Sequence, residues 1–345
     1  FGWHVAGDMD GAQVSAEFDV LLWSDIVRAS MAGTIPGTYA QLVRTAWTYF
    51  STGALWRLMR LRKGPVIAAL YPVGMLLGQL ALAVALAALI RAGLARGIDA
   101  VMPSAGVAGN ALALVAGLGA AVAALRWFKA KDNKLFAYYL MHDYAYSAQS
   151  RGAYPPELEQ RMAQFGDAIA ADLGTDVDEV LVVGHSSGAH LAVSILSDLI
   201  RAGRVPPKGP HLAFLSLGQV VPMVSFLPQA HRLRADLQFL STRDELVWVD
   251  VSAPGDGCAF ALCDPVAVSG VAPAEGKRWP LVISAAFTRT LSPERQRALR
   301  WRFFRLHLQY LHAFDRPGTY DYFASTAGPL TLAQRFDGRA PSRSR

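Results

Sequence analysis

Two long runs without a charged residue constrain this chain more than any other feature. The first covers residues 65–90 and the second covers residues 100–125. Each exceeds the roughly 20 apolar residues that an α-helix needs to cross a bilayer. Two helices buried in a large soluble core are the alternative, but two such runs separated by a short polar turn favour a transmembrane hairpin. Five glycines would let its helices approach closely: Gly78, Gly106, Gly109, Gly117 and Gly119.

Basic residues beside the runs predict how the hairpin is oriented. The connecting stretch carries only Arg91 and Arg96, whereas four basic residues precede the first run and four follow the second: Arg57, Arg60, Arg62, Lys63, Arg126, Lys129, Lys131 and Lys134. Basic flanks of a span stay predominantly on the cytoplasmic side. We therefore expect two spans in a bacterial inner membrane, with the rest of the chain in the cytoplasm.

Composition sets further limits on partners and cofactors. Of 345 residues, 52% are hydrophobic and 17% are charged, which suffices for a large core and an apolar hairpin. The net charge of +6 comes from residues beside the apolar runs and in the C-terminal tail, which favours a membrane surface over nucleic acid. Cys258 and Cys263 have no histidine at metal spacing, so we expect no metal, no other cofactor and no disulfide framework. Because the chain starts with Phe1, we expect a fragment whose natural N-terminus is missing.

A strand, a sharp turn and a helix are predicted around residue 186. Apolar β-favouring residues at 180–183 lead into Gly184-His185-Ser186-Ser187-Gly188, and helical spacing follows over residues 189–200. We expect a strained backbone to lift the Ser186 hydroxyl above the sheet edge, with a glycine on each side where a side chain would collide. The N–H of Ser187, at the start of the helix, would help to hold a developing oxyanion. An ordinary glycine-rich turn is the alternative.

The other strand signals predict an α/β fold. Residues 211–218 and 246–252 read as buried strands separated by helical stretches, which is typical of a mainly parallel sheet with flanking helices. Sites in such sheets lie beyond the carboxyl ends of the strands, so the turn at Ser186 and the loop 253–257 should share one rim. Residues 2–5 and 17–23 are predicted as two short strands of the same domain.

The turn Gly184 to Gly188, between a buried strand and a helix, resembles the G-x-S-x-G nucleophile elbow of the α/β-hydrolase superfamily. The catalytic order in that superfamily is serine, acid, histidine, which favours His307 as the base with His312 as the alternate. For the acid, Asp256 follows a strand end and is favoured over Asp250, which lies within the strand.

With these partners the chain looks like the lipase and esterase branch of that superfamily, and is similar to the class 3 lipases, over roughly residues 128–345 and the N-terminal strands. The resemblance implies cleavage of lipid or acyl esters through an acyl-enzyme on Ser186, with His307 as base and Asp256 orienting it. The chain departs from the family in three ways. It has no His-Gly loop for a second oxyanion donor, its candidate histidine falls in a helix-like stretch, and a hairpin interrupts the hydrolase domain.

Four segments follow from these predictions. Residues 1–63 carry the N-terminal strands and helix of the hydrolase domain, 64–127 the hairpin, 128–335 the catalytic domain and 336–345 a basic tail, in which residues 339–345 are expected to be disordered. The competing hypothesis is a catalytically inactive scaffold or interaction protein that keeps the hydrolase-like fold in the membrane.

Overall fold

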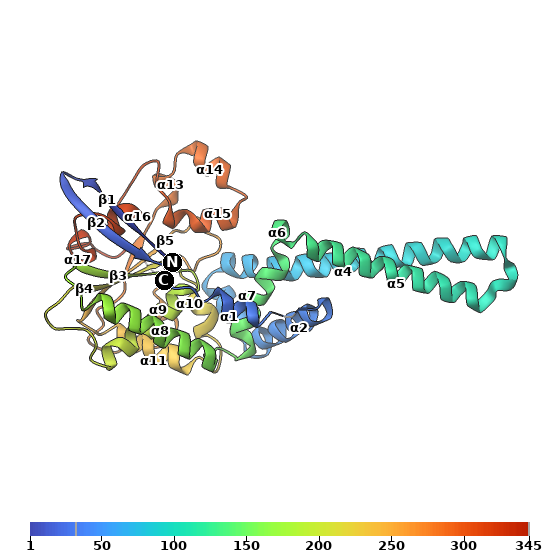
Figure 1. Ribbon diagram of the computed structural model, residues 1–345, viewed down its shortest axis with the longest axis horizontal. Helices are drawn as coiled ribbons and strands as arrows, with labels where there is room; N and C mark the ends of the chain where they lie inside the picture. The colour runs from blue at the N-terminus through green and yellow to red at the C-terminus, as the bar shows by residue number, and fades with distance from the viewer. Residues whose placement is uncertain (32, 344–345) are drawn as a thin grey trace. The chain divides into compact units, whose positions relative to one another are not determined.

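The computed structural model describes residues 1–31 and 33–343, apart from the side chains at 143 and 144 (Figure 1). The chain forms two compact units. Unit 1 consists of Phe1–Ile26, Thr48–Ala68 and Ser147–Arg345, and unit 2 of Val27–Trp47 and Ala69–Tyr146. Unit 1 contains every residue of the candidate site, and unit 2 contains most of the apolar hairpin.

Unit 1 is built on a parallel sheet of four strands in the order β3-β4-β5-β6. The strands are β3 Glu179–His185, β4 His211–Leu217, β5 Leu246–Ser252 and β6 Leu281–Ser284. The α/β class and the parallel sheet predicted from the sequence are thus confirmed. The first three strands coincide with the apolar runs that predicted them, whereas β6, which has only four residues, was not predicted.

Alternating residues of the strands face two different layers. Leu215, Leu217, Val249 and Val251 pack on one face against the C-terminal part of the chain, where the buried residues include Phe287, Tyr310, Phe314, Tyr320 and Leu332. On the other face lie α8 (Pro156–Asp172), α9 (Gly188–Arg201) and α11 (His231–Leu240) (Figure 1). This period-2 alternation with both faces covered is what a parallel sheet requires.

Short helices make up most of the C-terminal layer and the connections of unit 1. They are α10 Val221–Ser225, α12 Pro265–Val268, α13 Phe287–Thr290, α14 Pro293–Leu299, α15 Phe303–His307, η2 Leu308–Leu311, α16 Tyr322–Thr326 and α17 Leu332–Arg335.

The disorder predicted for residues 339–345 is wrong for the part that the structure describes. Phe336 is buried in the core, and the backbone N–H of Ser342 donates to the carbonyl oxygen of Val282 in β6 at 2.9 Å. The Ser342 hydroxyl also accepts from the N–H of Ser284 at 3.0 Å. These bonds to the backbone of β6 hold the segment in place, and residues 344 and 345 lie outside the described chain.

The N-terminal elements also differ from the prediction. β1 (Gly2–Met9) and β2 (Ala12–Asp19) form a separate antiparallel hairpin, and among the described residues they pair only with each other. The single helix predicted within residues 1–63 is divided into α2 (Ile35–Ser51) and α3 (Ala54–Leu61). The division falls at Gly53, whose φ of 69° is left-handed and ends a right-handed helix. α1 covers Ser24–Ala29.

The hairpin consists of α4 (Lys63–Val101) and α5 (Gly106–Ala130), joined by a short 3₁₀ turn, η1 (Pro103–Ala105). Both helices are long and apolar enough to cross a membrane. Only 17% of the most apolar window of each is buried, which disfavours a pair of soluble core helices. The turn lies later than predicted, because α4 continues through Arg91 and Arg96.

Two of the five glycines permit close packing of these helices. A Cβ atom on Gly117 would lie 2.6 Å from the carbonyl oxygen of Ala87, and one on Gly109 would lie 2.7 Å from the Ile98 side chain. Gly106 has a φ of 42° at the turn. Gly78 and Gly119 have no described atom within 4 Å of the position of a Cβ, so the prediction is wrong for these two.

Two further helices follow the hairpin, α6 (Asp132–Leu135) and α7 (Ala137–Gln149), and α7 packs with α2 beside α4. The Asp132 carboxylate accepts backbone N–H bonds at the start of α7, as a helix cap does. Tyr138 and Met141 of α7 form a buried cluster with Leu42 of α2 and Leu76 of α4.

Candidate active site

Ser186 lies at the turn between β3 and α9 with a left-handed backbone, φ 55°. Such a conformation costs a non-glycine residue roughly 1–3 kcal/mol and persists only where neighbours enforce it. Its N–H donates to the carbonyl oxygen of Leu217 at 2.9 Å, which extends the β3–β4 pairing by one residue. Its carbonyl oxygen accepts from Ala189 at 3.2 Å and begins the helix. Strand pairing on one side and helix on the other therefore fix the strained turn.

The two glycines that flank this turn have different roles. A Cβ atom on Gly184 would lie 2.9 Å from the Cα of Ala189, so a side chain there would collide with the helix. A Cβ on Gly188 would meet no described atom within 4 Å. The predicted collision is thus confirmed for Gly184 and wrong for Gly188.

His307 and Asp256 form a buried pair beside the turn. Nδ1 of His307 lies 2.7 Å from Oδ2 of Asp256, and both residues are almost fully buried. With the carboxylate as acceptor, Nδ1 carries the proton, so Nε2 of His307 presents a lone pair. Nε2 is buried and has no hydrogen-bond partner in the part of the chain that the structure describes. The bond between Nε2 and the Ser186 hydroxyl is therefore not formed.

Tyr310 and Gly218 place this pair next to the turn. The Tyr310 hydroxyl donates to Oδ2 of Asp256 at 3.0 Å and accepts from the N–H of Ala253 at 2.9 Å. Gly218 has a φ of 52°, and a Cβ there would lie 2.6 Å from Cε2 of Tyr310 and 3.1 Å from Cε1 of His307. Because Gly218 follows Leu217, the acceptor for Ser186, the imidazole of His307 lies against the same strand end as the serine.

His185 holds the backbone of His307. Its Nε2 donates to the carbonyl oxygen of His307 at 3.0 Å, and the two rings have centroids 4.6 Å apart. Burial, together with the neighbouring His307, lowers the pKa of His185 to about 4. The ring of His185 is therefore neutral near pH 7 and places no charge beside His307.

The alternates Asp250 and His312 have other partners. Asp250 accepts from the Ser216 hydroxyl at 2.6 Å, and Ser216 in turn accepts from the indole N–H of Trp248 at 2.9 Å. Complete burial raises the pKa of Asp250 to about 7. His312 is exposed, and its Nδ1 bonds to the carbonyl oxygen of Leu308 at 2.8 Å. The structure thus brings His307 and Asp256 together and leaves both alternates outside this pair.

The oxyanion candidate Ser187 directly precedes α9 and has helical backbone angles, φ −63° and ψ −29°. Its N–H therefore belongs to the first turn of the helix, where backbone N–H groups are unpaired within the helix and attract negative charge.

The pair and one neighbouring residue could together offer three ligands to a metal ion. Single ligand atoms of Asp256, Cys258 and His307 all lie within 4.8 Å of one another. Burial and the nearby Asp256 raise the pKa of the Cys258 thiol to about 12, so the thiol is protonated in the metal-free site. The other oxygen of Asp256 already accepts from the N–H of Cys258 at 2.8 Å. This set fits a carboxylate that orients a histidine better than a metal centre.

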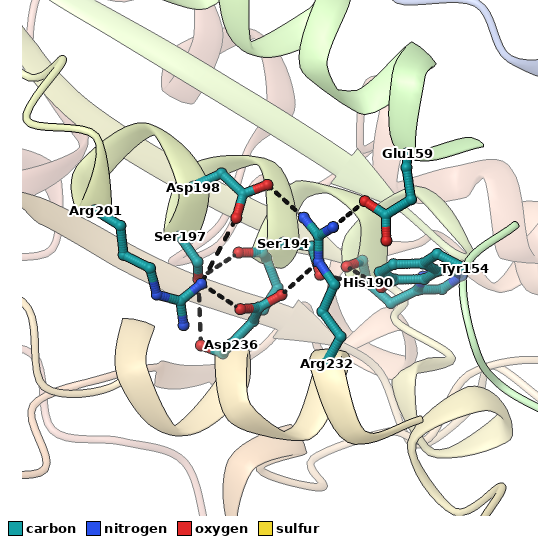
Figure 2. A network of polar contacts seen from close by, with 10 residues as sticks. Tyr154, Glu159, His190, Ser194, Ser197, Asp198, Arg201, Arg232 and Asp236 are labelled. Atoms are coloured by element: carbon teal, nitrogen blue, oxygen red, sulfur yellow. Dashed lines mark hydrogen bonds and ion pairs between the residues drawn. The ribbon is translucent and has the colours of Figure 1, made fainter. Parts of the chain in front are cut away.

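A polar network fixes α9 behind the turn (Figure 2). Arg232 of α11 forms ion pairs with Glu159 of α8 and Asp198 of α9, and Asp236 of α11 pairs with Arg201 of α9 at 2.5 Å. The Tyr154 hydroxyl bonds to Ser194 and His190 of α9, at 3.1 Å and 3.3 Å. These contacts join α8, α9 and α11 into one layer, so the helix that begins at the turn has little freedom to move.

No family model matches the chain, and neither the curated proteins nor the solved structures contain a match to it. The site is therefore described by its own geometry alone.

Sequence reasoning missed three residues that shape this site: His185, Gly218 and Tyr310. Tyr310 follows His307 by three residues in a helical stretch, a spacing that places both side chains on one face. That spacing was the available signal for Tyr310. The other two owe their roles to contacts between separate strands and helices.

The flanking glycines make a matched pair of variants. We expect Gly184→Ala to lower the free energy of unfolding by about 1–3 kcal/mol, because its methyl group would enter the strand–helix crossing. Gly188→Ala should leave stability unchanged or raise it, because Gly188 is the first helical residue of α9 and alanine has a higher helix propensity than glycine. Thermal unfolding followed by circular dichroism in nanodiscs provides the measurement. Equal stability of the two variants would show that the turn is not packed as described.

We expect the stability of the folded protein to depend on pH through the buried Asp250. Its folded-state pKa is raised to about 7 from an ordinary value of 3.8, so the folded protein retains a proton that the unfolded chain releases. Asp250 therefore makes its full contribution to the free energy of unfolding below a pH of 3.8, and this contribution is lost as the pH rises to about 7. Asp250→Asn keeps an acceptor for Ser216 but cannot ionise, and should flatten the dependence over this window.

Chemical denaturation at several pH values tests the Asp250 effect. Burial also raises the pKa of Glu179 to about 7, so Glu179→Gln should show a separate flattening in the same window. An unchanged pH dependence in Asp250→Asn would contradict the assignment of a neutral Asp250.

Proposed function

We propose that the chain is a membrane-anchored serine hydrolase that cleaves lipid or acyl esters. The observation that carries this proposal is the buried bond of 2.7 Å between His307 and Asp256, next to a serine on a left-handed turn. A serine hydroxyl is a weak nucleophile near neutral pH and needs a histidine oriented by a carboxylate. These three residue types converge here from distant parts of the chain.

The topology supports the same proposal. Ser186 directly follows β3, Asp256 follows β5, and His307 lies after β6. Because the strands are parallel, their carboxyl ends form one edge of the sheet, where sites of α/β proteins form. The order serine, acid, histidine along the chain is also that of the catalytic residues in the α/β-hydrolase superfamily, and we include membership of that superfamily in the proposal.

The proposed reaction begins when Nε2 of His307 accepts the proton of the Ser186 hydroxyl as its oxygen attacks the ester carbonyl carbon. Asp256, bonded to Nδ1, stabilises the imidazolium that forms. The N–H of Ser187 donates to the developing oxyanion. His307 returns the proton to the leaving alkoxide. His307 then accepts a proton from a water molecule as the water oxygen attacks the acyl carbon, and it gives this proton back to Ser186 as the acid product leaves. The unpartnered Nε2 is the atom that the first step needs.

The substrate class follows from the hairpin. Two helices able to cross a membrane would hold the domain where amphiphilic esters are concentrated. We propose that the bilayer supplies the substrate and that the domain lies on the cytoplasmic side of a bacterial inner membrane. The basic residues near the outer ends of α4 and α5 support this orientation.

An inactive scaffold is the competing function, and one observation favours it. Nε2 of His307 and the Ser186 hydroxyl do not form a hydrogen bond. In hydrolases without substrate this bond is often long and tightens only when substrate binds. Chemical reactivity of Ser186 therefore decides between the two functions.

A fluorophosphonate probe tests the hydrolase, because it reacts with activated serines. We expect labelling of the protein in nanodiscs, loss of labelling in Ser186→Ala, and a fall of roughly 10⁴-fold in the labelling rate in Asp256→Asn. Asp250→Asn is the matched control and should label normally, since Asp250 bonds elsewhere. Labelling that survives Ser186→Ala, or no labelling of the folded wild type, would leave the scaffold.

The orientation has its own test at the turn between the hairpin helices. Ser104 lies in η1, so a cysteine at this position should react with a membrane-impermeant maleimide added outside intact cells freed of their outer membrane. An exposed position of unit 1, Val177, should react as a cysteine only after the membrane is opened. The reverse pattern would mean that the domain faces outward.

A further inference from the structure

The segment at residues 300–308, which ends next to the catalytic candidate His307, exposes apolar and basic side chains together. Trp301 is 74% exposed, and Phe303, Phe304 and Leu308 are also exposed. Arg302 and Arg305 lie between these residues and Arg300 precedes them, and all three arginines are exposed as well. Large aromatic residues at a protein surface mark interaction sites when they occur side by side, as they do here.

The inner side of this segment is anchored in the core of unit 1. His307 is buried, and Leu306 packs against the buried cluster that contains Tyr310 and Phe314. Leu299, just before the segment, belongs to the same cluster. The exposed aromatic rings therefore project from a fixed support: Trp301 and Phe303 lie edge to face, with ring centroids 6.4 Å apart.

The charge of the segment is of one sign. Between residues 295 and 314 the sequence has five arginines and no acidic residue. Among the described residues, Arg300, Arg302 and Arg305 form no ion pair with a carboxylate, while Arg297 pairs with Glu294. The Arg300 guanidinium stacks over the Trp301 ring at 5.3 Å from the centroid. Three guanidinium groups without a carboxylate partner, beside aromatic rings, match an anionic phospholipid surface, whose phosphates bind arginine and whose headgroup region accommodates tryptophan and phenylalanine.

Contacts within unit 1 place the segment near the start of α4. A Cβ atom on Gly257, next to Asp256, would lie 3.7 Å from the ring of Phe303. Gly257 also approaches Gly64, since a Cβ there would lie 3.2 Å from the Gly257 carbonyl oxygen. Gly64 is in the first turn of α4. Phe303 and the loop of Asp256 thus lie close to the beginning of the helix that would anchor the chain.

We propose that residues 300–308 dock on an anionic phospholipid surface, with the aromatic side chains in the headgroup region and the three arginines on lipid phosphates. This docking depends on α4 crossing the membrane but not on hydrolysis at Ser186, so the two proposals can fail separately. It would open the site beside His307 directly onto the lipid.

The test places an environment-sensitive nitrobenzoxadiazole label at residue 304 of the full chain in nanodiscs. Phe304→Cys is made in a Cys258→Ala background, where the remaining Cys263 is buried. The discs contain phosphatidylcholine with brominated acyl chains, with or without phosphatidylglycerol. We expect blue-shifted label emission and quenching by the bromines, both stronger with phosphatidylglycerol. A label at Val177→Cys, an exposed position just before β3, should show neither effect.

Charge variants test the role of the arginines. Each basic side chain near an anionic surface contributes roughly a fivefold preference, about 1 kcal/mol, so Arg300→Gln/Arg302→Gln/Arg305→Gln should abolish the gain from phosphatidylglycerol. The matched control Lys208→Gln/Arg339→Gln removes exposed charges elsewhere and should retain it.

Three results would overturn the proposal. Emission from residue 304 typical of water in both kinds of disc would show that the segment does not dock. A blue shift without bromine quenching would show that protein, such as a second copy of the chain, covers the segment. Equal quenching in discs with and without phosphatidylglycerol, and in chains with and without the three arginines, would exclude an anionic surface. Fluorophosphonate labelling of Ser186, measured on the same samples, reports on hydrolysis independently.

Discussion

The buried carboxylate of Asp256 is the group on which the arrangement of this site depends. It accepts from the N–H of Cys258, from the Tyr310 hydroxyl and from Nδ1 of His307. Hydrogen bonds of this kind stabilise an ionised carboxylate that burial alone would destabilise. They also decide the geometry, because an acceptor bound on both oxygens cannot rotate. The ring of His307 is therefore fixed by a group that is itself fixed by the backbone after β5.

The turn at Ser186 is held differently, because β3 lies at one end of the strand order and pairs only with β4 among the described residues. An edge strand has fewer hydrogen bonds to restrain it than a central strand. The ion pairs among α8, α9 and α11 supply restraint from the opposite face (Figure 2). The left-handed backbone of Ser186 thus persists between a strand paired on one side and a helix clamped on the other.

Local patterns predicted much of this molecule, and long-range contacts explain most of the rest. The apolar runs predicted β3, β4, β5 and both long helices, since burial and length leave a direct mark on the sequence. The end of the hairpin was misplaced because Arg91 and Arg96 suggested a loop, although isolated arginines are good helix formers. β6 and the segment around Ser342 carry no periodic signal, because β6 is held by its pairing with β5 and the segment by its bonds to β6. The choice of Asp256 rested on its place after a strand and that of His307 on the chain order of the family that the sequence resembles, whereas the contribution of His185 required the fold itself.

The length of α4 has a consequence for how such a helix can sit in a membrane. At about 1.5 Å per residue, its 39 residues extend for about 58 Å, whereas a hydrocarbon core is roughly 30 Å thick. If α4 crosses a bilayer, roughly half of its length must therefore lie outside the hydrocarbon, in water or against other parts of the chain. Leu76, which is buried against Leu42 of α2 and Tyr138 of α7, marks a part of the helix that protein covers.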